Sequence, residues 1–482
     1  MSDLKSAEIS IWKESFDASS FSAIGFILEL VYTLLLVKVL PQQSVGVFFF
    51  YLAIVFLIIQ ISKGIGIAVR KHVSSISKER TQSKYFWSGV CLLFPILAII
   101  MVCLFSISMF FDSHLPINIT FNGFLSILFA SLGISIMELG RLQLAGSGEP
   151  GKAEKHRVLI GKTSMLLLTT LLLLYPSAEL AISLRGLGFA VSGFVMINLS
   201  PHMLIKPDKK SVLDVLRFSK WSIPTNLLND FYHRWDTLLL GIMVGAISIS
   251  YYDSSVRIAT IGFPLMIGIS SAANVKLSGL YESNQDFETV FSKILTVSPL
   301  FAYPFLIVFF FSGEYILSVI FGPEYIPAAM MLFLLSIQQV FQSFRLQFEA
   351  LFNSIDSPKE TTKTSGVSVL VNVATAPILV LEFGAIGVLY STLLSEAIRL
   401  VLYEYQSYSK LNTIFINKAI LLQPILIIIL SVCIKIVSNL YSLTPKTLFP
   451  ISLLSIIVFY ILLYFTSTQI RHIFTEIKQE LI

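Results

Sequence analysis

Long runs of apolar residues, each about twenty residues in length, alternate with short polar segments along the chain. An α-helix needs about 20 apolar residues to cross the hydrocarbon core of a bilayer. The pattern therefore predicts an all-α polytopic membrane protein with about fourteen transmembrane helices. The predicted spans are roughly 21–40, 45–67, 86–111, 121–145, 158–176, 178–200, 221–245, 249–275, 293–312, 327–352, 364–383, 385–406, 417–437 and 446–467.

The composition supports this class. Of the 482 residues 55% are hydrophobic and only 13% are charged, about half the charge of an ordinary soluble protein. A large soluble protein is therefore excluded. The polar start MSDLKSAEISIWKESFDASS has no early apolar core, and no cleavable signal peptide is expected.

Neither a metal nor a cofactor is expected. The cysteines Cys91, Cys103 and Cys433 lie inside apolar runs, at spacings that fit neither a metal site nor a likely disulfide framework. The six histidines are scattered, and the sequence contains no GxxxxGK[ST] nucleotide motif. Any energy for transport would come from an ion gradient or from the gradient of the substrate itself.

Basic residues gather on one side of the predicted membrane. The segment RKHVSSISKERTQSK after the second span is basic, and so are the loops after spans 4 and 6, to which Lys162 and Lys206 are assigned. The opposite segments FDSHLPINIT and FSGEYILSVIFGPEYIPAA contain no Lys or Arg. By the positive-inside rule the basic side is cytoplasmic. Both termini are then expected in the cytoplasm, with the chain in the cell (inner or cytoplasmic) membrane.

The two halves of the chain share short sequence matches at a constant offset. The tripeptide Arg141-Leu142-Gln143 recurs as Arg345-Leu346-Gln347, and TLLL at 33–36 recurs at 237–240, both 204 positions later. EPGK follows span 4 as SPKE follows span 10, and Gly186 and Gly188 open span 6 as Gly384 and Gly387 open span 12. Six spans separate the matches, so the halves cross the membrane in the same sense, as parallel repeats do.

The duplication predicts two pseudo-symmetric six-helix lobes plus two C-terminal helices. The expected boundaries are 1–205 for the N-lobe, 206–220 for an amphipathic linker helix on the cytoplasmic surface, 221–410 for the C-lobe and 411–482 for helices 13 and 14. Two lobes of this kind suggest a transporter, with its substrate path between them.

Ionisable side chains inside the spans are the candidate functional residues, because each costs about 2.5–3.5 kcal/mol near the middle of a bilayer. They concentrate in spans 1, 2, 7 and 8, whereas spans 3, 5, 9, 11 and 14 have essentially none in their interiors. Helical spacing places them on polar stripes that can share a water-filled cavity. The candidates are Lys63, Arg70, Arg234 and Arg257 for substrate binding, and Glu29, Asp230, His233, Asp236, Asp253 and Asn274 for ion coupling or for lining the cavity.

Each of these assignments has a structural alternative. Asp230–Arg234 and Asp253–Arg257 can be self-neutralising pairs that hold helices together. Arg141 and Arg345 have Glu138 and Glu349 one turn away, so a structural or snorkelling role is favoured for both arginines. Lys63 and Arg70 have no acidic neighbour within a turn, and for them the functional interpretation is favoured. A surplus of Lys and Arg suits an anion, and guanidinium groups match phosphate.

The chain resembles the polysaccharide flippases (Wzx-type) of the superfamily that also contains the multidrug and toxic-compound exporters. The resemblance rests on motifs in a shared order: LLLVKVLPQQSVGVFFFYLAIV, GIGIAVRKHV, LRFSKWSIPTNLLNDFYHRWDTLLLGIMVG, SYYDSSVRIA, FGPEYIPAA and FGAIGVLYSTLLSEA. It covers nearly the whole chain. The chain departs from the family in AISISYY, where a serine replaces the usual glycine, and in the acid at Asp253.

The resemblance implies two six-helix lobes around a central cavity that is lined by cations, and Lys63, Arg70, Arg234 and Arg257 fit that role. It implies a flippase, not an enzyme, that moves a polyprenyl-(di)phosphate-linked oligosaccharide to the outer leaflet by alternating access with a cation gradient. Polymerases or glycosyltransferases are possible partners, a monomer is expected, and nucleic acid is not. The alternatives are a cation-coupled multidrug exporter and, less favoured, a polytopic glycan polymerase or glycosyltransferase.

Overall fold

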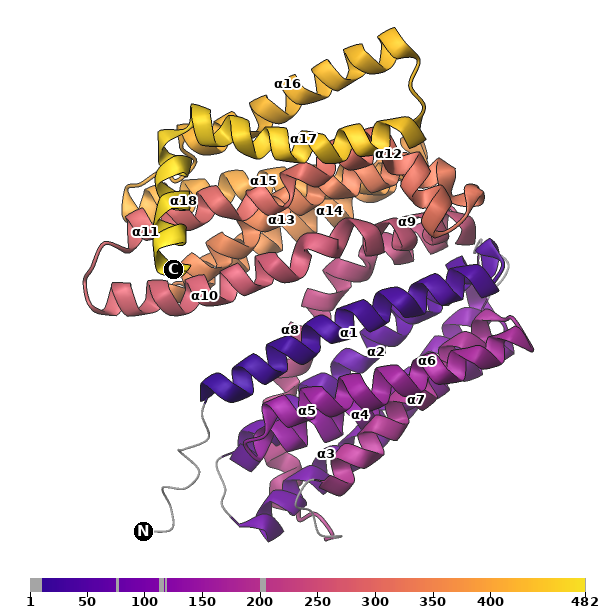
Figure 1. The fold of residues 1–482 in the computed structure, drawn as a ribbon. Helices are drawn as coiled ribbons and strands as arrows, with labels where there is room; N and C mark the ends of the chain where they lie inside the picture. The colour runs from indigo at the N-terminus through magenta and orange to yellow at the C-terminus, as the bar shows by residue number, and fades with distance from the viewer. Residues whose placement is uncertain (1–10, 75–77, 112–116, 118, 200–204, 482) are drawn as a thin grey trace. The chain divides into compact units, whose positions relative to one another are not determined.

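The computed structural model describes residues 11–74, 78–111, 117, 119–199 and 205–481, and every regular element within them is helical. The chain forms two compact units, Met1–Ser250 and Tyr251–Ile482, which are described separately below. Most of the long helices of each unit run side by side, whereas α18 runs across its neighbours in the second unit (Figure 1).

The first unit contains most of the helices of the predicted N-lobe. Its helices are α1 (Ile11–Val39), α2 (Gln42–Ser74), α3 (Glu79–Phe111), α4 (Phe121–Gly146), α5 (Pro150–His156), the π-helix η1 (Arg157–Lys162), α6 (Thr163–Thr169), the 3₁₀-helix η2 (Thr170–Leu173), α7 (Ala178–Leu199) and α8 (Lys209–Met243). The short helix α9 (Ala246–Ala259) contains the boundary between the units.

The second unit continues from α9. Its elements are η3 (Thr260–Gly262), α10 (Phe263–Glu282), α11 (Phe287–Val297), η4 (Ser298–Phe301), α12 (Tyr303–Ile320), η5 (Pro323–Ala328), α13 (Ala329–Ser354), α14 (Pro358–Phe383), α15 (Ile386–Leu411), α16 (Lys418–Tyr441), α17 (Pro445–Thr466) and α18 (Thr468–Leu481).

The predicted fold class is confirmed. Within the described part of the chain, thirteen helical stretches are long and apolar enough to cross a membrane. The helix α8, whose C-terminal part corresponds to the predicted span 221–245, is a further long helix, so the expected number of about fourteen agrees with the structure. Tight turns separate α8 from α9 at Gly245 (φ 129°) and α14 from α15 at Gly384 (φ 61°). The terminal helix α18 was not predicted.

The internal duplication is reflected in how each unit packs. In the first unit α4, the fourth span, packs against both α2 and α7. In the second unit α13, the tenth span, packs against both α10 and α15. Gln143 on α4 and Gln347 on α13, which end the repeated tripeptide, are both fully buried. Superposition of Arg141 on Arg345, and the lobe boundaries at 205, 220 and 410, stay predictions.

One detail of the proposed repeat is wrong. Gly186 lies in the interior of α7, where it packs against α4: a Cβ atom on Gly133 would lie 2.1 Å from the Gly186 carbonyl oxygen. Gly384 instead ends α14 with a positive φ. The first glycine permits a close approach of two helices and the second permits a turn, so the two positions are not equivalent.

The predicted linker helix is not a separate element. The helix α8 runs without a break from Lys209 through Pro224 to Met243, and so joins the segment 206–220 to the seventh span. It begins at Asp208, whose carboxylate accepts a hydrogen bond from the Ser211 backbone N–H at 2.8 Å. This hydrogen bond and the ion pair with Lys84 at 2.9 Å hold the pKa of Asp208 well below its usual value.

Candidate functional site

Two of the predicted cavity cations, Lys63 and Arg234, belong to neighbouring helices of the first unit. Lys63 lies on α2 and Arg234 on α8, and these helices pack along their length. The Arg234 guanidinium lies 4.2 Å from the centre of the Phe56 ring on α2. Its Nε is 3.9 Å from the Asp230 carboxylate, which also lies within electrostatic range of Lys63. The structure therefore brings Lys63, Arg234 and Asp230 together.

The contact between Arg234 and Asp230 is long for an ion pair. A charge-assisted N–H···O hydrogen bond measures about 2.7–2.9 Å, whereas this separation is 3.9 Å. Both side chains are partly exposed, at 26% for Arg234 and 22% for Asp230. The geometry of this contact is that of a loosely associated pair.

The other candidates of the first unit have different environments. Arg70 is exposed near the C-terminal end of α2, His233 is exposed on α8, and Asp236 is buried with 6% of its surface exposed. Arg70 lies seven residues after Lys63 on α2, a spacing that places both on one face of the helix.

The remaining candidates, Asp253, Arg257 and Asn274, belong to the second unit. Asp253 is buried, and Asn274 accepts a hydrogen bond from Ser354 of α13 through its backbone oxygen at 3.0 Å. The predicted span 8 is divided into α9, the short turn η3 and α10, so its polar residues do not follow one regular helix. The proposal that Arg257 shares a cavity with Lys63 and Arg234 stays a prediction.

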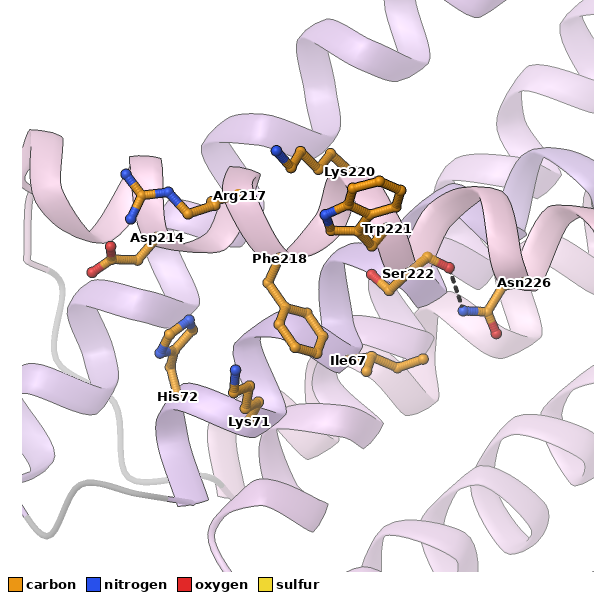
Figure 2. Close-up of a pocket in the computed structure, with 10 residues that line it drawn as sticks. All are labelled: Ile67, Lys71, His72, Asp214, Arg217, Phe218, Lys220, Trp221, Ser222 and Asn226. Carbon is orange, nitrogen blue, oxygen red and sulfur yellow. Dashed lines mark hydrogen bonds between the residues drawn. The ribbon is translucent and has the colours of Figure 1, made fainter. Parts of the chain in front are cut away.

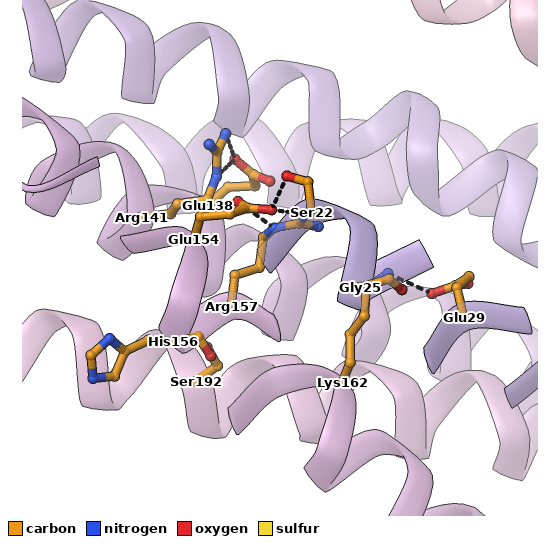
Figure 3. A network of polar contacts seen from close by, with 10 residues as sticks. All are labelled: Ser22, Gly25, Glu29, Glu138, Arg141, Glu154, His156, Arg157, Lys162 and Ser192. Atoms are coloured by element: carbon orange, nitrogen blue, oxygen red, sulfur yellow. Dashed lines mark hydrogen bonds and ion pairs between the residues drawn. The ribbon is translucent and has the colours of Figure 1, made fainter. Parts of the chain in front are cut away.

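Glu29 makes buried ionic contacts with two cations of the first unit. Its carboxylate lies 2.8 Å from Nη1 of Arg185 on α7 and 3.3 Å from Nζ of Lys162 in η1. Lys162 also donates a hydrogen bond of 2.7 Å to the Gly25 carbonyl of α1 (Figure 3). These contacts join α1, η1 and α7.

The Glu29 cluster, which consists of Glu29, Lys162 and Arg185, carries one formal negative and two positive charges. All three residues are buried, with 9%, 8% and 4% of their surfaces exposed. Tyr32, Phe56 and Phe189 surround the Arg185 guanidinium, with ring centres 5.3–5.9 Å away. Aromatic faces partly compensate a buried guanidinium, because their quadrupole is negative above the ring.

The assignment of Lys162 to a cytoplasmic loop is wrong. Lys162 lies inside the fifth helical stretch, Pro150–Leu173, and is buried. Its segment is a π-helix, in which i→i+5 hydrogen bonds bring residues five apart close to one face. Arg157 and Lys162, at the two ends of η1, can therefore both reach carboxylates in the first unit.

A second set of ion pairs lies beside the Glu29 cluster. Arg157 pairs with Glu154, which also accepts a hydrogen bond from Ser22 at 2.9 Å. Arg141 pairs with Glu138 at 2.8 Å (Figure 3). In the second unit Arg345 lies 4.0 Å from Glu349. Both repeated arginines therefore lie near an acid one turn away on their own helix, Arg141 in a close ion pair and Arg345 in a loose one.

Three charged residues that have buried partners were missed in the sequence. Arg185 was not singled out, and neither was the Glu396–Arg399 pair of α15, which is 3.2 Å long and only 2–3% exposed. A signal was available, because each of these residues interrupts an apolar run and a charge inside a membrane needs a partner.

Comparison of the sequence with known protein families identifies the family of this chain. The model of a family described as "Polysaccharide biosynthesis protein" matches residues 35–330, more than half of the chain. The chain belongs to the polysaccharide biosynthesis protein family.

Two relatives come from the archaeon Haloferax volcanii. The chain is 27% identical over 205 residues to a protein named "Probable low-salt glycan biosynthesis flippase Agl15", a match that covers 42% of this chain and 43% of the relative. It is 23% identical over 217 residues to "Probable flippase AglR", covering 44% and 45%. The matched segments span less than half the length of each relative.

Solved structures agree on the fold. The chain is similar to a structure titled "Lipid II flippase MurJ, inward closed conformation", with a TM-score of 0.74 at 16% identity, covering 92% of this chain and 97% of the other. It is also similar to an inward-facing multidrug resistance MATE family transporter of the MOP superfamily, with a TM-score of 0.64 at 15% identity, covering 81% and 96%. At these identities the likeness concerns the fold.

Proposed function

We propose that this protein is a flippase that carries a polyprenyl-(di)phosphate-linked oligosaccharide from the cytoplasmic to the outer leaflet, for surface polysaccharide or glycan assembly. The family match carries the proposal, and three further findings support it. The two relatives are named as flippases, one of them in glycan biosynthesis. A lipid II flippase has a similar fold. Lys63 and Arg234 lie on packed helices of a multi-pass membrane protein.

The cations supply what a phosphate needs in order to cross a bilayer. An unpaired anion in a low dielectric is prohibitively costly, so a counter-charge must accompany the phosphate along its path. Lys63 and Arg234 provide that charge on the first unit, with Arg70 closer to the end of α2, and Arg257 provides it on the second. We propose that the lobes alternate in access, that a cation gradient drives them, and that Glu29, Asp230, His233, Asp236, Asp253 and Asn274 line the path or couple the ion.

The loose Asp230–Arg234 pair suits reversible binding. A bidentate guanidinium–phosphate contact is stronger than a 3.9 Å ion pair, so the substrate can displace the carboxylate while it is bound. When the substrate leaves, Asp230 neutralises the guanidinium again. A tight, fully buried pair such as Glu396–Arg399 would resist this exchange.

A cation-coupled multidrug exporter is the second candidate, because MATE transporters share the fold. An exporter of organic cations would require surplus carboxylate in its cavity, whereas Asp230 interacts with two cations, Lys63 and Arg234. Uptake of a fluorescent organic cation into vesicles that contain the purified protein separates the two functions. Uptake that is unchanged by Arg234→Ala would favour the exporter.

Substitution of the cations tests the flippase function directly. We expect Lys63→Ala and Arg234→Ala each to lower surface glycan about tenfold or more, because each removes a charge-assisted contact of about 1.5–3 kcal/mol. Arg234→Lys should partly restore export if charge alone is required, and should fail if the planar fork is required. The measurement is surface glycan relative to the amount of protein in the membrane.

Arg141→Ala is the matched control, since Arg141 is paired with Glu138 on its own helix. It should lower the amount of protein more than the export per molecule. Full export by the Lys63→Ala/Arg234→Ala double variant would overturn the role of the cations.

The proposed setting follows from the same function. We place the protein in the cell membrane with both termini in the cytoplasm, acting as a monomer beside polymerases or glycosyltransferases that use the same lipid-linked glycan.

A further inference from the structure

A cavity of about 750 Å³ lies between the C-terminal end of α2 and the first half of α8. Ile67, Lys71 and His72 line it from α2, and Asp214, Phe218 and Trp221 are among the residues that line it from α8 (Figure 2). None of the predicted cavity residues lines this space. It is therefore a separate candidate site.

The cavity is rich in cations that have no ionic partner. Lys71, Arg217 and Lys220 line it and are exposed, and no ion pair in the described part of the chain engages any of the three. Among the described residues that line the cavity Asp214 is the one acid, and it accepts a hydrogen bond from the Tyr85 hydroxyl at 3.2 Å. The site therefore attracts an anion.

Aromatic rings adjoin these cations. The Lys71 ammonium lies 4.3 Å from the centre of the Phe218 ring, and the two side chains point towards each other across the gap between the helices (Figure 2). The Lys220 ammonium lies 5.5 Å from the Trp221 ring, and Trp221 is 72% exposed. An exposed tryptophan beside cations is typical of the membrane–water interface.

The face of α8 that points away from the protein also combines apolar and basic side chains. Ser211 and Ser219 are buried, and Ser211 accepts a hydrogen bond from Ser88 of α3 at 2.8 Å, so this side of α8 faces the protein. Leu213 and Leu216 are exposed, at 45% and 43%, together with the basic residues. Since α2 ends at Ser74, one turn beyond Lys71, the cavity lies where a membrane span ends. Exposed leucines and lysines at this depth match acyl chains and lipid headgroups respectively.

We propose that this cavity binds the phosphate headgroup of an anionic phospholipid of the surrounding bilayer. Lys71, Arg217 and Lys220 neutralise the phosphate, while the exposed Leu213, Leu216 and Trp221 contact the lipid chains. A soluble anion would use the charges but not the exposed apolar residues, and this observation favours a lipid. The proposal does not depend on the transported substrate.

Lipid binding by the full-length protein provides the test. The purified protein is titrated in detergent with phosphatidylglycerol or with phosphatidylcholine, and bound lipid is counted by native mass spectrometry. We expect preferential binding of phosphatidylglycerol. The variant Lys71→Gln/Arg217→Gln/Lys220→Gln should lose the preference, since each basic residue near an anionic surface contributes about fivefold.

The matched control is Lys206→Gln/Lys209→Gln/Lys210→Gln, which makes the same charge change at the start of the same segment, outside the cavity. It should keep most of the preference. The single variant Arg217→Gln replaces an exposed side chain, so it is expected to fold and to weaken phosphatidylglycerol binding about fivefold.

Three results would overturn the proposal. Equal binding of the two lipids would show that the site does not select an anionic headgroup. An equal loss of the preference in the control variant would show that general electrostatic attraction, and not the cavity, causes it. Displacement by millimolar inorganic phosphate would indicate an anion site that does not require a lipid. Stronger binding of a polyprenyl phosphate at the same residues would indicate that the site binds the transported substrate and not a phospholipid.

Discussion

At Glu29, one carboxylate faces two cations in an environment that excludes most water. The sequence places Glu29 on a polar face of the first span, but its partners Lys162 and Arg185 lie more than 130 residues further along the chain. No local spacing pairs residues at such a distance. Their proximity is therefore a product of packing among α1, η1 and α7.

Neutralising Glu29 is expected to destabilise the protein strongly. Glu29→Gln leaves two buried cations without their carboxylate, and breaking a buried ion pair costs about 3–5 kcal/mol. We expect a clearly lower midpoint of thermal unfolding for the purified protein. Detergent-solubilised samples of equal concentration provide the measurement.

Glu149→Gln is the matched control for this substitution. Glu149 also pairs with a lysine, Lys152, at 2.8 Å, but both side chains are 42% exposed. Exposed pairs contribute about 0–1 kcal/mol. If the two variants unfold at the same temperature, the Glu29 cluster is not a buried stabilising element.

At the scale of helices, close packing depends on residues without side chains. Gly133 on α4 and Gly186 on α7 lie against each other where these helices cross. In a membrane the hydrophobic effect does not drive helices together, and small residues at crossings allow the van der Waals contact that does.

Gly133→Ala is expected to weaken this crossing. A Cβ atom at position 133 would lie 2.1 Å from the Gly186 carbonyl oxygen, and both atoms belong to rigid backbone, so the helices must separate. The thermal unfolding midpoint should fall, and the yield of folded protein with it. Thermal unfolding monitored by intrinsic fluorescence is a suitable measurement.

Gly366→Ala on α14 serves as the control, because a Cβ atom there meets no atom within 4 Å. It should be neutral, or stabilising by up to about 1 kcal/mol through helix propensity. An equal loss of stability in both variants would show that the close α4–α7 contact does not determine the stability of the protein.

At the scale of the whole molecule, the distribution of Lys and Arg predicts the orientation in the membrane. Lys363 follows the tenth span and is expected in the cytoplasm, whereas Ser113, which lies outside the described residues, follows the third span and is expected outside. In a variant without the native cysteines, a membrane-impermeant thiol reagent applied to intact cells should label Ser113→Cys and not Lys363→Cys. The opposite pattern of labelling would contradict the orientation, and permeabilised cells provide the control for reactivity.

The sequence by itself determined the class of fold and the approximate number and positions of the membrane-spanning helices. These features follow from local chemistry, because a bilayer requires long apolar runs whose backbone groups are satisfied within each helix. Glu138 and Glu349 were found as partners of Arg141 and Arg345 for the same reason, since an i,i+3 or i,i+4 pair is fixed by the helix itself.

Only the tertiary structure decided which distant charges meet. Lys162 was assigned to a cytoplasmic loop with its basic neighbours, whereas a π-helix together with contacts to α1 makes it a buried partner of Glu29. The continuity of α8 through Pro224, and the cavity that α8 forms with α2, likewise depend on packing between segments about 150 residues apart. Hydropathy reports the environment of each segment, whereas ion pairs and cavities depend on which segments become neighbours.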